Sequence, residues 1–511
     1  MYSILSGLLL VFSYPTYPYG ILAWIGLVPL LLAITNQSIW KTAQLGFITG
    51  FIYFYGILYW LNGLYKFSWL VVPGQILLSC YLSIYIVLFA VLLNWLFPKP
   101  GYRRLWVSPI LWVAIEYFRQ IGYLGFSWGI LGYTQYQVLP IIQIADITSV
   151  LGISFLIVLV NAGIAYLIPT LFTKDKPRKL GFCPLCCIPL LLIPALLVLV
   201  YIYGLWQIRA YTYTNQNQLK LAIVQGNIPQ DLKWDEQLEK EHQAIHFQLS
   251  ETAAQQTQPD LIVWPETAIT EVLTENPELI SRFQSLGKKY QTQFLVGSPD
   301  IEPIDTTWRI YTSAFQIDRD KGIIKKYDKT ALVPFGEYVP LSGHFPWLKK
   351  IIQGPGDFNP GNKYTQFELY SHNSIKWQFA SVICFESTMS QVVRRAMVNP
   401  VDFLIIITND AWFGKTEAPY QHADMAIFRA IENRTYIARA ANTGYSCFIT
   451  PTGIIVKGLQ IYTRGYLTDT IQARKTRTFY TQYGDILAYL CWMITLILIG
   501  IKISSRNKIN R

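Results

Sequence analysis

The most prominent pattern in the chain is a series of long apolar runs that fill its N-terminal part. From Met1 to about Gln207 these runs alternate with short polar loops, and one more run lies near the C-terminus. Because a helix needs about 20 mostly apolar residues to cross a bilayer, we predict eight membrane spans. They lie near residues 2–14, 17–35, 43–63, 68–97, 106–120, 138–172, 182–206 and 485–503. The first run lacks the basic start and the cleavage site of a signal peptide, so we interpret it as a retained span.

Between the seventh and eighth spans the pattern changes to that of a soluble domain. Short β-branched runs, such as 220–228 and 261–267, predict strands, and polar stretches over 236–256, 277–290 and 426–440 predict helices. This alternation indicates a layered α/β domain, and the uniformly apolar strands indicate sheets that are covered on both faces. We therefore predict three regions. They are a helical membrane domain over 1–207, an α/β domain over 208–483, and a last span with a basic tail over 484–511.

The positions of lysine and arginine give this arrangement an orientation. Basic residues fall in alternate loops and in the C-terminal tail: Lys41, Lys99, Arg103, Arg104, Lys174, Lys176, Arg178, Lys179, Lys502, Arg506, Lys508 and Arg511. Because cytoplasmic loops carry an excess of these residues, both termini are expected in the cytoplasm and the α/β domain outside. The chain is 52% hydrophobic and 14% charged, and its net charge of +11 is explained by this anchoring. Nucleic-acid binding is therefore not expected.

Three polar positions follow predicted strands of the α/β domain. In α/β sheets, catalytic and binding residues usually lie at these carboxyl ends of the strands. Glu266 follows "LIVWP", Lys329 follows "IIKKYD", and Cys384 ends the strand in "SVICFES". A cysteine thiol needs a base or a positive charge to become a nucleophile. Glu266 could accept its proton, and Lys329 could stabilise an oxyanion together with the main-chain N–H of Phe385. Spacing alone leaves the other interpretation open, namely a solvated glutamate, a surface lysine and a core cysteine.

The other cysteine and histidine positions give weaker indications of a disulfide or a metal site. Cys384 and Cys447 both fall in the outer domain, where a disulfide between them would abolish thiol chemistry. The "CPLCC" stretch at Cys183 lacks a second cysteine pair, and His242 and His246 have no carboxylate between them. We therefore expect no metal site and no cofactor.

Four stretches of the outer domain together resemble the nitrilase superfamily. They are "VWPETA" (263–268), "YDKTALVPFGEYVP" (327–340), "VICFES" (382–387) and "ITNDAWFG" (407–414). This resemblance implies an αββα sandwich with a Glu–Lys–Cys triad. With seven spans before the domain and one after it, the whole chain resembles the family of bacterial apolipoprotein N-acyltransferases. The stretches "GNIPQDLKWDE" (226–236) and "FSWGILGYTQ" (126–135) are also similar to that family.

The resemblance implies a role for eight positions. They are Glu266 as base, Lys329 as oxyanion stabiliser, Cys384 as nucleophile, Glu337, Phe385 and Glu386 as supporting residues, and Trp128 and Trp234 in activity or lipid handling. Phe385 stands where many members have tyrosine, so the hydroxyl is absent and only the main-chain N–H remains. Trp128 fits an interfacial membrane anchor equally well.

The reaction that the resemblance implies is a transfer between lipids. An acyl chain moves from a membrane phospholipid to Cys384 as a thioester, and then to the α-amino group of a diacylglyceryl-cysteine at the N-terminus of an apolipoprotein. The implied location is the bacterial inner membrane, and we expect a monomer. A lid over 345–364 is expected to keep water from the thioester, although an ordinary loop fits that stretch too. The alternative functions are a membrane-anchored nitrilase-type amidase and a non-catalytic membrane scaffold.

Overall fold

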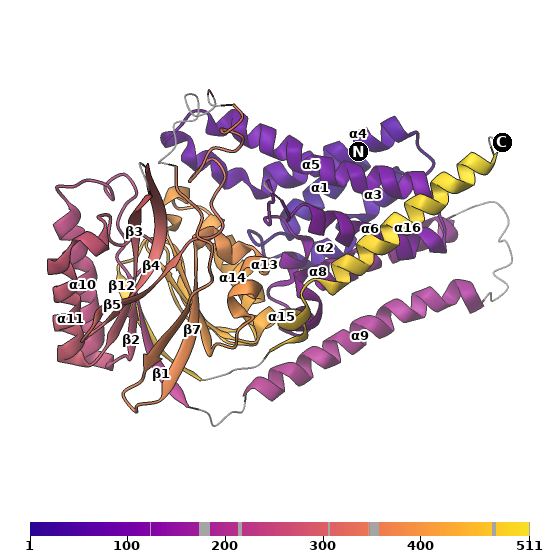
Figure 1. Ribbon diagram of the computed structural model, residues 1–511. Helices are drawn as coiled ribbons and strands as arrows, with labels where there is room; N and C mark the ends of the chain where they lie inside the picture. The colour runs from indigo at the N-terminus through magenta and orange to yellow at the C-terminus, as the bar shows by residue number, and fades with distance from the viewer. Residues whose placement is uncertain are drawn as a thin grey trace. The chain divides into compact units, whose positions relative to one another are not determined.

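The protein was analysed as a computed structural model. It describes residues 1–122, 124–172, 184–212, 217–304, 307–345, 347, 357–472 and 477–509. The chain divides into two compact units, one formed by Met1–Ala210 with Tyr483–Arg511 and the other by Tyr211–Gln482. We call the first the helical unit and the second the α/β unit, and describe each by itself (Figure 1).

The helical unit is built from apolar helices. They are α1 (Tyr2–Ser13), η1 (Gly20–Leu22), α2 (Ala23–Gly26), α3 (Val28–Ala33), α4 (Ile39–Ile57), η2 (Tyr59–Lys66), α5 (Val71–Leu96), α6 (Tyr102–Phe118), η3 (Leu131–Gln135), α7 (Leu139–Ile142), α8 (Ala145–Phe172), α9 (Pro184–Thr212) and α16 (Ile486–Ile509). Helix α4 packs on α5, and α16 packs along α6. In the second of these contacts the indole N–H of Trp492 donates to the carbonyl of Ala114 over 2.6 Å.

Within the described residues, four helices are long and apolar enough to cross a membrane. They are Val71–Leu96, Ala145–Ile168, Leu191–Tyr211 and Ile486–Ser505. A fifth crossing results if α4 and η2, which meet at a bend of 51°, form one broken span. The described residues thus contain four or five candidate spans by this criterion, fewer than the eight predicted.

The excess comes from three predicted spans that are short or broken. Helix α1 has 12 residues and spans about 18 Å, well below the roughly 30 Å of a bilayer core. The predicted span over 17–35 is divided among η1, α2 and α3. Helix α6 has 17 residues and begins with Tyr102, Arg103 and Arg104. Apolar composition alone does not reveal such breaks, because a short helix can bury apolar side chains against its neighbours.

The α/β unit contains two six-stranded sheets. The first has the order β12-β1-β2-β3-β4-β5 and the second the order β11-β10-β9-β8-β7-β6. The strands are β1 (Gln218–Gln225), β2 (Leu261–Val263), β3 (Gln293–Ile304), β4 (Thr307–Asp318), β5 (Gly322–Asp328), β6 (Gln366–Tyr370), β7 (Lys376–Ile383), β8 (Phe403–Thr408), β9 (Tyr436–Ala441), β10 (Ser446–Ile449), β11 (Ile455–Leu459) and β12 (Gly465–Gln472). A buried apolar cluster, which includes Ile223, Leu295, Phe379 and Ile405, draws side chains from both sheets.

Helices cover the outer faces of both sheets. Helices α10 (Glu239–Thr257) and α11 (Pro277–Tyr290) lie against the first sheet, and α13 (Ser390–Met397) and α14 (Ala418–Asn433) lie against the second (Figure 1). Short helical turns complete the unit: η4 (Leu273–Glu275), η5 (Cys384–Thr388), η6 (Asp410–Phe413) and α15 (Phe479–Tyr483). The order helix, sheet, sheet, helix is the αββα sandwich that the resemblance implies.

Strand direction brings several strand ends to one edge of each sheet. In the first sheet β1, β2 and β3 are parallel, and β5 returns to their direction because β3–β4 and β4–β5 are both antiparallel. In the second sheet β7, β8 and β9 are parallel. The loops after these strands therefore emerge together, and they carry the predicted catalytic residues.

Two local predictions need correction or fall outside the description. The helix predicted over 426–440 ends at Asn433, where Arg434 adopts a left-handed φ of 48°, and Tyr436–Ala441 is strand β9. Apolar residues recur on both sides of this turn, so the apolar pattern alone does not mark the change from helix to strand. Of the proposed lid over 345–364, only residues 345, 347 and 357–364 are described, and Cys183 also lies outside the described residues.

Candidate active site

The converging strand ends bring the predicted carboxylates and lysine together. Glu266 follows β2, and Lys329 directly follows β5 in the same sheet. Lys329 Nζ donates to Glu266 Oε1 over 3.2 Å and to Glu337 Oε1 over 2.7 Å. Lys329 is 1% exposed and Glu266 is 6% exposed. A buried ammonium that faces two carboxylates is thus the centre of the cluster.

The electrostatics of the cluster follow from its burial. Burial by itself lowers the pKa of Lys329, but the carboxylates of Glu266 and Glu337 outweigh it and raise this pKa well above its ordinary value. Burial raises the pKa of Glu337, against the opposing effect of Lys329. Lys329 therefore stays charged, and it can stabilise negative charge that develops beside it.

The position of Glu266 is fixed by contacts with both sheets. Its Oε2 accepts a hydrogen bond of 2.8 Å from the main-chain N–H of Asn409, the residue after β8 in the second sheet. On the other side, β3 approaches so closely at Gly297 that an added Cβ would lie 2.7 Å from Glu266 Cα. Only glycine fits there without displacing the carboxylate.

Cys384 lies in the turn between β7 and η5, in the second sheet. Its φ of 52° is in the left-handed region, which costs an L-residue about 1–2 kcal/mol. Burial and the Glu266 carboxylate raise the pKa of its thiol, while Lys329 opposes them. The thiol is free, as is that of Cys447, so the structure contains no disulfide between them. A thiol in this state needs a base to react.

Glu386, two residues after Cys384, is a fully buried carboxylate that joins two loops. Its Oε1 accepts from the hydroxyl of Tyr327 (2.8 Å), from the N–H and hydroxyl of Thr330 (both 2.7 Å) and from the N–H of Ala331 (3.1 Å). Its Oε2 accepts from the N–H of Ile383 over 2.7 Å. Glu386 thus holds the loop of Lys329 against the turn of the cysteine. Phe385 lies between Cys384 and Glu386 and is 9% exposed.

A second buried network lies under the same turn, and the sequence analysis missed it. His422 Nε2 lies 2.8 Å from Ser387 Oγ and 3.1 Å from the carbonyl oxygen of Cys384. His422 Nδ1 donates to Asp410 Oδ1 over 2.9 Å, and Arg439 donates to Asp410 Oδ2 over 2.9 Å. The network fixes the main chain of the cysteine turn. Its members come from separate elements, so no local motif marks it.

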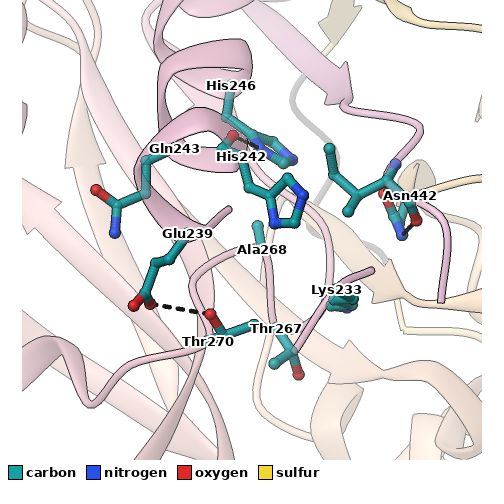
Figure 2. Close-up of a pocket in the computed structure, with 10 residues that line it drawn as sticks. Lys233, Glu239, His242, Gln243, His246, Thr267, Ala268, Thr270 and Asn442 are labelled. Atoms are coloured by element: carbon teal, nitrogen blue, oxygen red, sulfur yellow. Dashed lines mark hydrogen bonds between the residues drawn. The ribbon is translucent and has the colours of Figure 1, made fainter. Parts of the chain in front are cut away.

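A buried lysine, Lys233, is a further residue that the sequence analysis missed. It lies beside Trp234 in "GNIPQDLKWDE", where only the tryptophan was singled out. Lys233 is 4% exposed, and its Nζ donates to the main-chain carbonyl of Glu266 over 3.1 Å. It also lines a small pocket together with Glu239, His242, His246, Thr267 and Asn442 (Figure 2). The burial of Lys233 beside Glu266, the predicted base, is visible only in the structure.

The remaining predicted residues have different surroundings. Trp234 is 51% exposed on the α/β unit. Trp128 belongs to the helical unit, where it is 3% exposed, packs against Trp60 at 5.2 Å between ring centroids, and accepts a hydrogen bond from Arg119 at its carbonyl. A buried indole of this kind is not an exposed interfacial anchor within its unit. The described residues contain no group of three or more His, Cys, Asp or Glu suited to a metal ion.

Comparison with known proteins explains this arrangement. The family model "Apolipoprotein N-acyltransferase N-terminal domain" matches residues 6–163, and the model "Carbon-nitrogen hydrolase" matches residues 220–480. The apolipoprotein N-acyltransferase of Geobacter metallireducens is 37% identical over 494 residues, which cover 96% of this chain and 92% of that protein. The chain belongs to the apolipoprotein N-acyltransferase family.

A second relative of the same name agrees with this family assignment. The apolipoprotein N-acyltransferase of Chlorobaculum tepidum is 28% identical over 512 residues, covering 96% of this chain and 93% of that protein. Among solved structures, a mutant amidase from Nesterenkonia sp. AN1 is 16% identical, with a TM-score of 0.39 over 55% of this chain and 98% of that one. Family members are N-acyltransferases by name, so the buried Glu266 and Lys329 and the partly buried Cys384 lie in a domain of an acyl-transfer enzyme.

Proposed function

We propose that the chain transfers an acyl chain from a membrane phospholipid to the α-amino group of the diacylglyceryl-cysteine at the N-terminus of an apolipoprotein. The acyl chain travels as a thioester on Cys384. The observation that carries the proposal is the cluster of Glu266, Lys329 and Glu337, together with Cys384 directly after β7, in a chain of this family.

The first half of the reaction forms the thioester. Glu266 accepts the thiol proton, and the sulfur of Cys384 attacks the ester carbonyl of the phospholipid. Lys329 stabilises the oxyanion, helped by the main-chain N–H of Phe385. The C–O bond then breaks, Glu266 returns the proton to the leaving oxygen, and a lysophospholipid departs.

The second half releases the acyl chain to the amine. The neutral α-amino group attacks the thioester carbonyl, and Lys329 again stabilises the oxyanion. The C–S bond breaks, and Glu266 transfers a proton from the nitrogen to the sulfur. The products are an amide and the free thiol. Dividing the reaction in this way replaces one difficult step with two easier ones.

Glu337 and Glu386 support this chemistry without reacting in our proposal. Glu337 orients Lys329, and its other oxygen, Oε2, accepts from the N–H of Val333 over 2.8 Å, which fixes its own loop. Glu386 fixes the loop that carries Lys329. Trp234, exposed on the α/β unit, is proposed to contact lipid.

We propose that the chain lies in the bacterial inner membrane with both termini in the cytoplasm. The α/β domain over 208–483 then faces outward, next to the membrane surface that holds the acyl chains of both substrates. Two features support this arrangement, namely apolar helices of sufficient length on both sides of the α/β unit and the basic residues of the alternate loops and tail.

The test follows a labelled acyl chain. The full-length protein in lipid is incubated with a phospholipid that carries the label, and the peptide of Cys384 is examined by mass. We expect an acyl adduct in the wild type and in Cys447→Ala, a control at a buried thiol of the same domain, and none in Cys384→Ala.

A second step separates transferase from hydrolase. A diacylglyceryl-cysteine peptide with a free amine should discharge the adduct and take up the label, and an N-acetylated peptide should not. The absence of any adduct in the wild type would overturn the proposal. Loss of the label to water at the same rate with and without the peptide would favour the alternative amidase.

A further inference from the structure

Lys233 is a buried ammonium whose hydrogen bond does not require a charge. Its Nζ donates to the main-chain carbonyl of Glu266, over 3.1 Å. A neutral amide could donate to that carbonyl, whereas desolvating an ammonium costs several kcal/mol. The positive charge is therefore expected to be offset by negative charge nearby.

The negative charge near Lys233 lies on the side of the reacting groups. Burial lowers the pKa of Lys233 to about 8, and the two groups that act against this are Glu266 and the thiol of Cys384. On the other side is the pocket of Figure 2, where His242 and His246 are both buried and each has one ring nitrogen without a hydrogen-bond partner. Burial lowers the pKa of His246 to about 4, so this side adds no positive charge at neutral pH.

The remaining charged groups around Lys233 are engaged elsewhere. Glu239, which lines the same pocket, accepts from the hydroxyl of Thr270 over 2.9 Å and from the N–H of Glu271 over 3.0 Å (Figure 2). Arg464 acts on His246 and donates to the carbonyl of Gly226 over 3.2 Å. Lys329 is shared between Glu266 and Glu337. Two carboxylates thus face Lys329, and Lys233 supplies the second positive charge.

The hydrogen bond of Lys233 also fixes a strained segment of main chain. Thr267, directly after Glu266, has a left-handed φ of 49°. The carbonyl that Lys233 holds belongs to the peptide between these two residues, so the bond sets the orientation of that peptide. Glu266 must keep its direction toward Lys329 and Asn409 while this turn is formed.

We propose that Lys233 is a positioning residue of the acyl-transfer reaction, which holds the main chain at Glu266 and keeps one negative charge on the Glu266–Cys384 pair. Without this ammonium, the carboxylates of Glu266 and Glu337 would share one cation, Lys329, and the negative charge on Glu266 would be less well stabilised. A protonated Glu266 cannot accept the proton of the thiol. The inference rests on the proposed function, in which Glu266 is the base.

The test compares Lys233→Met, which removes the charge, with Lys233→Arg, which keeps it. Lys240→Met, at an exposed lysine of α10, is the matched control. Two rates are measured against pH in the full-length protein. They are acylation of Cys384 by labelled phospholipid in a single turnover, and alkylation of Cys384 by iodoacetamide followed by mass.

The acidic limb is the low-pH part of each profile, where the rate rises with pH. In Lys233→Met we expect this limb to move to higher pH by about one to two units in both profiles. At a pH below the midpoints of the limb in both proteins, this corresponds to a loss of about 10- to 100-fold in both rates. In Lys233→Arg the acidic limb should stay near that of the wild type even if the plateau falls, and Lys240→Met should match the wild type in both profiles.

Two outcomes would overturn the inference. One is a Lys233→Met protein whose two profiles lie within the error of the wild type. The other is a lower plateau and melting temperature with no movement of the acidic limb, which would indicate a purely structural role. If the wild type takes up no acyl label, the proposed function fails, while the alkylation profile still decides the role of Lys233.

Discussion

At the scale of single residues, Glu386, two positions after Cys384, is a carboxylate whose hydrogen bonds hold the surrounding loops together. Both of its oxygens are used, and the donors come from residues 327–331 as well as from Ile383. Since it is fully buried, each of these bonds replaces a bond to water that was lost on folding. The residue therefore contributes to the fold and to the position of Lys329 together.

We predict that Glu386→Gln destabilises the α/β unit by about 3 kcal/mol and abolishes acylation of Cys384. The amide places an N–H where the carboxylate accepted hydrogen bonds, so at least one buried donor loses its partner. The measurement is thermal unfolding of the full-length protein in detergent, followed by the acylation assay. Glu368→Gln is the control, because this carboxylate is 39% exposed, and its change should be about 0.5 kcal/mol or less. A melting temperature equal to that of the wild type would contradict the prediction.

The sequence indicates which residues are candidates for the site more readily than it indicates which residues they contact. Glu266, Lys329 and Cys384 each follow a strand, and β-strand patterns are local, so these three positions could be found without a structure. By contrast, the hydrogen bond that the N–H of Thr330 donates to Glu386 forms only when the two sheets pack against each other. Such a contact cannot be seen in a local sequence pattern. Lys233 could not be identified, because a lysine in a polar loop is usually exposed and only burial distinguishes this one.

At the scale of elements, the turn of Cys384 is supported by a buried ion pair that links α14, η6 and β9. His422 lies on α14, Asp410 opens η6, and Arg439 lies on β9. Burial would raise the pKa of Asp410, but Arg439 and His422 hold it well below its ordinary range. A carboxyl whose pKa is lowered by folding stabilises the protein above its unfolded pKa, and this stabilisation is lost as the pH falls.

This gives a prediction for the pH dependence of stability. In the wild type the melting temperature should fall steeply as the pH drops below about 4, where Asp410 would be protonated in the unfolded chain. Asp410→Asn should lower stability by about 3 kcal/mol near neutral pH, because Arg439 is left buried without its carboxylate. It should also show a shallower fall between about pH 5 and about pH 2.

The control for this experiment is Asp320→Asn, at a carboxylate that is 67% exposed. Its stability and its pH slope should match those of the wild type. If Asp410→Asn retained the full acid-dependent slope of the wild type, Asp410 would not be a source of acid sensitivity.

The same elements show where pattern reading loses accuracy. The helix over 277–290 is predicted with the bounds of α11, because Asn276 caps it through a hydrogen bond to the N–H of Leu279 and Pro277 follows directly. The helix over 426–440 is wrong in its second half, because the stretch is apolar on both sides of the turn at Arg434. Asn276 and Pro277 mark the start of α11 in the sequence, whereas no such residues mark the change from helix to strand at Arg434.

At the scale of the whole molecule, the chain alternates between two environments. The described helices Leu191–Tyr211 and Ile486–Ser505 are each 17% buried, although their mean hydropathies are 2.1 and 2.3. Apolar helices with so much exposed surface need a lipid environment. They flank the α/β unit in the sequence, so a candidate span adjoins that unit at each end.

We predict opposite accessibility for two introduced cysteines. Lys240→Cys on α10 should react with a membrane-impermeant maleimide in spheroplasts, and Ser505→Cys near the end of α16 should react only after the membrane is opened. The wild-type chain gives the background from its native cysteines. Labelling of Ser505→Cys in closed spheroplasts would contradict a cytoplasmic C-terminus.

The pairing of β12 with β1 has a consequence for how the α/β unit is put together. Strand β12, the last of the unit, completes the sheet that begins with β1, and all strands of the other sheet lie between them in the sequence. Glu266 and Lys329, the proposed base and oxyanion stabiliser, follow strands of the sheet that β12 completes, and Cys384, the proposed nucleophile, follows a strand of the other sheet. During synthesis the first sheet is therefore incomplete until residues 465–472 have been made. The proposed triad thus depends on a strand that is made after all three of its own residues.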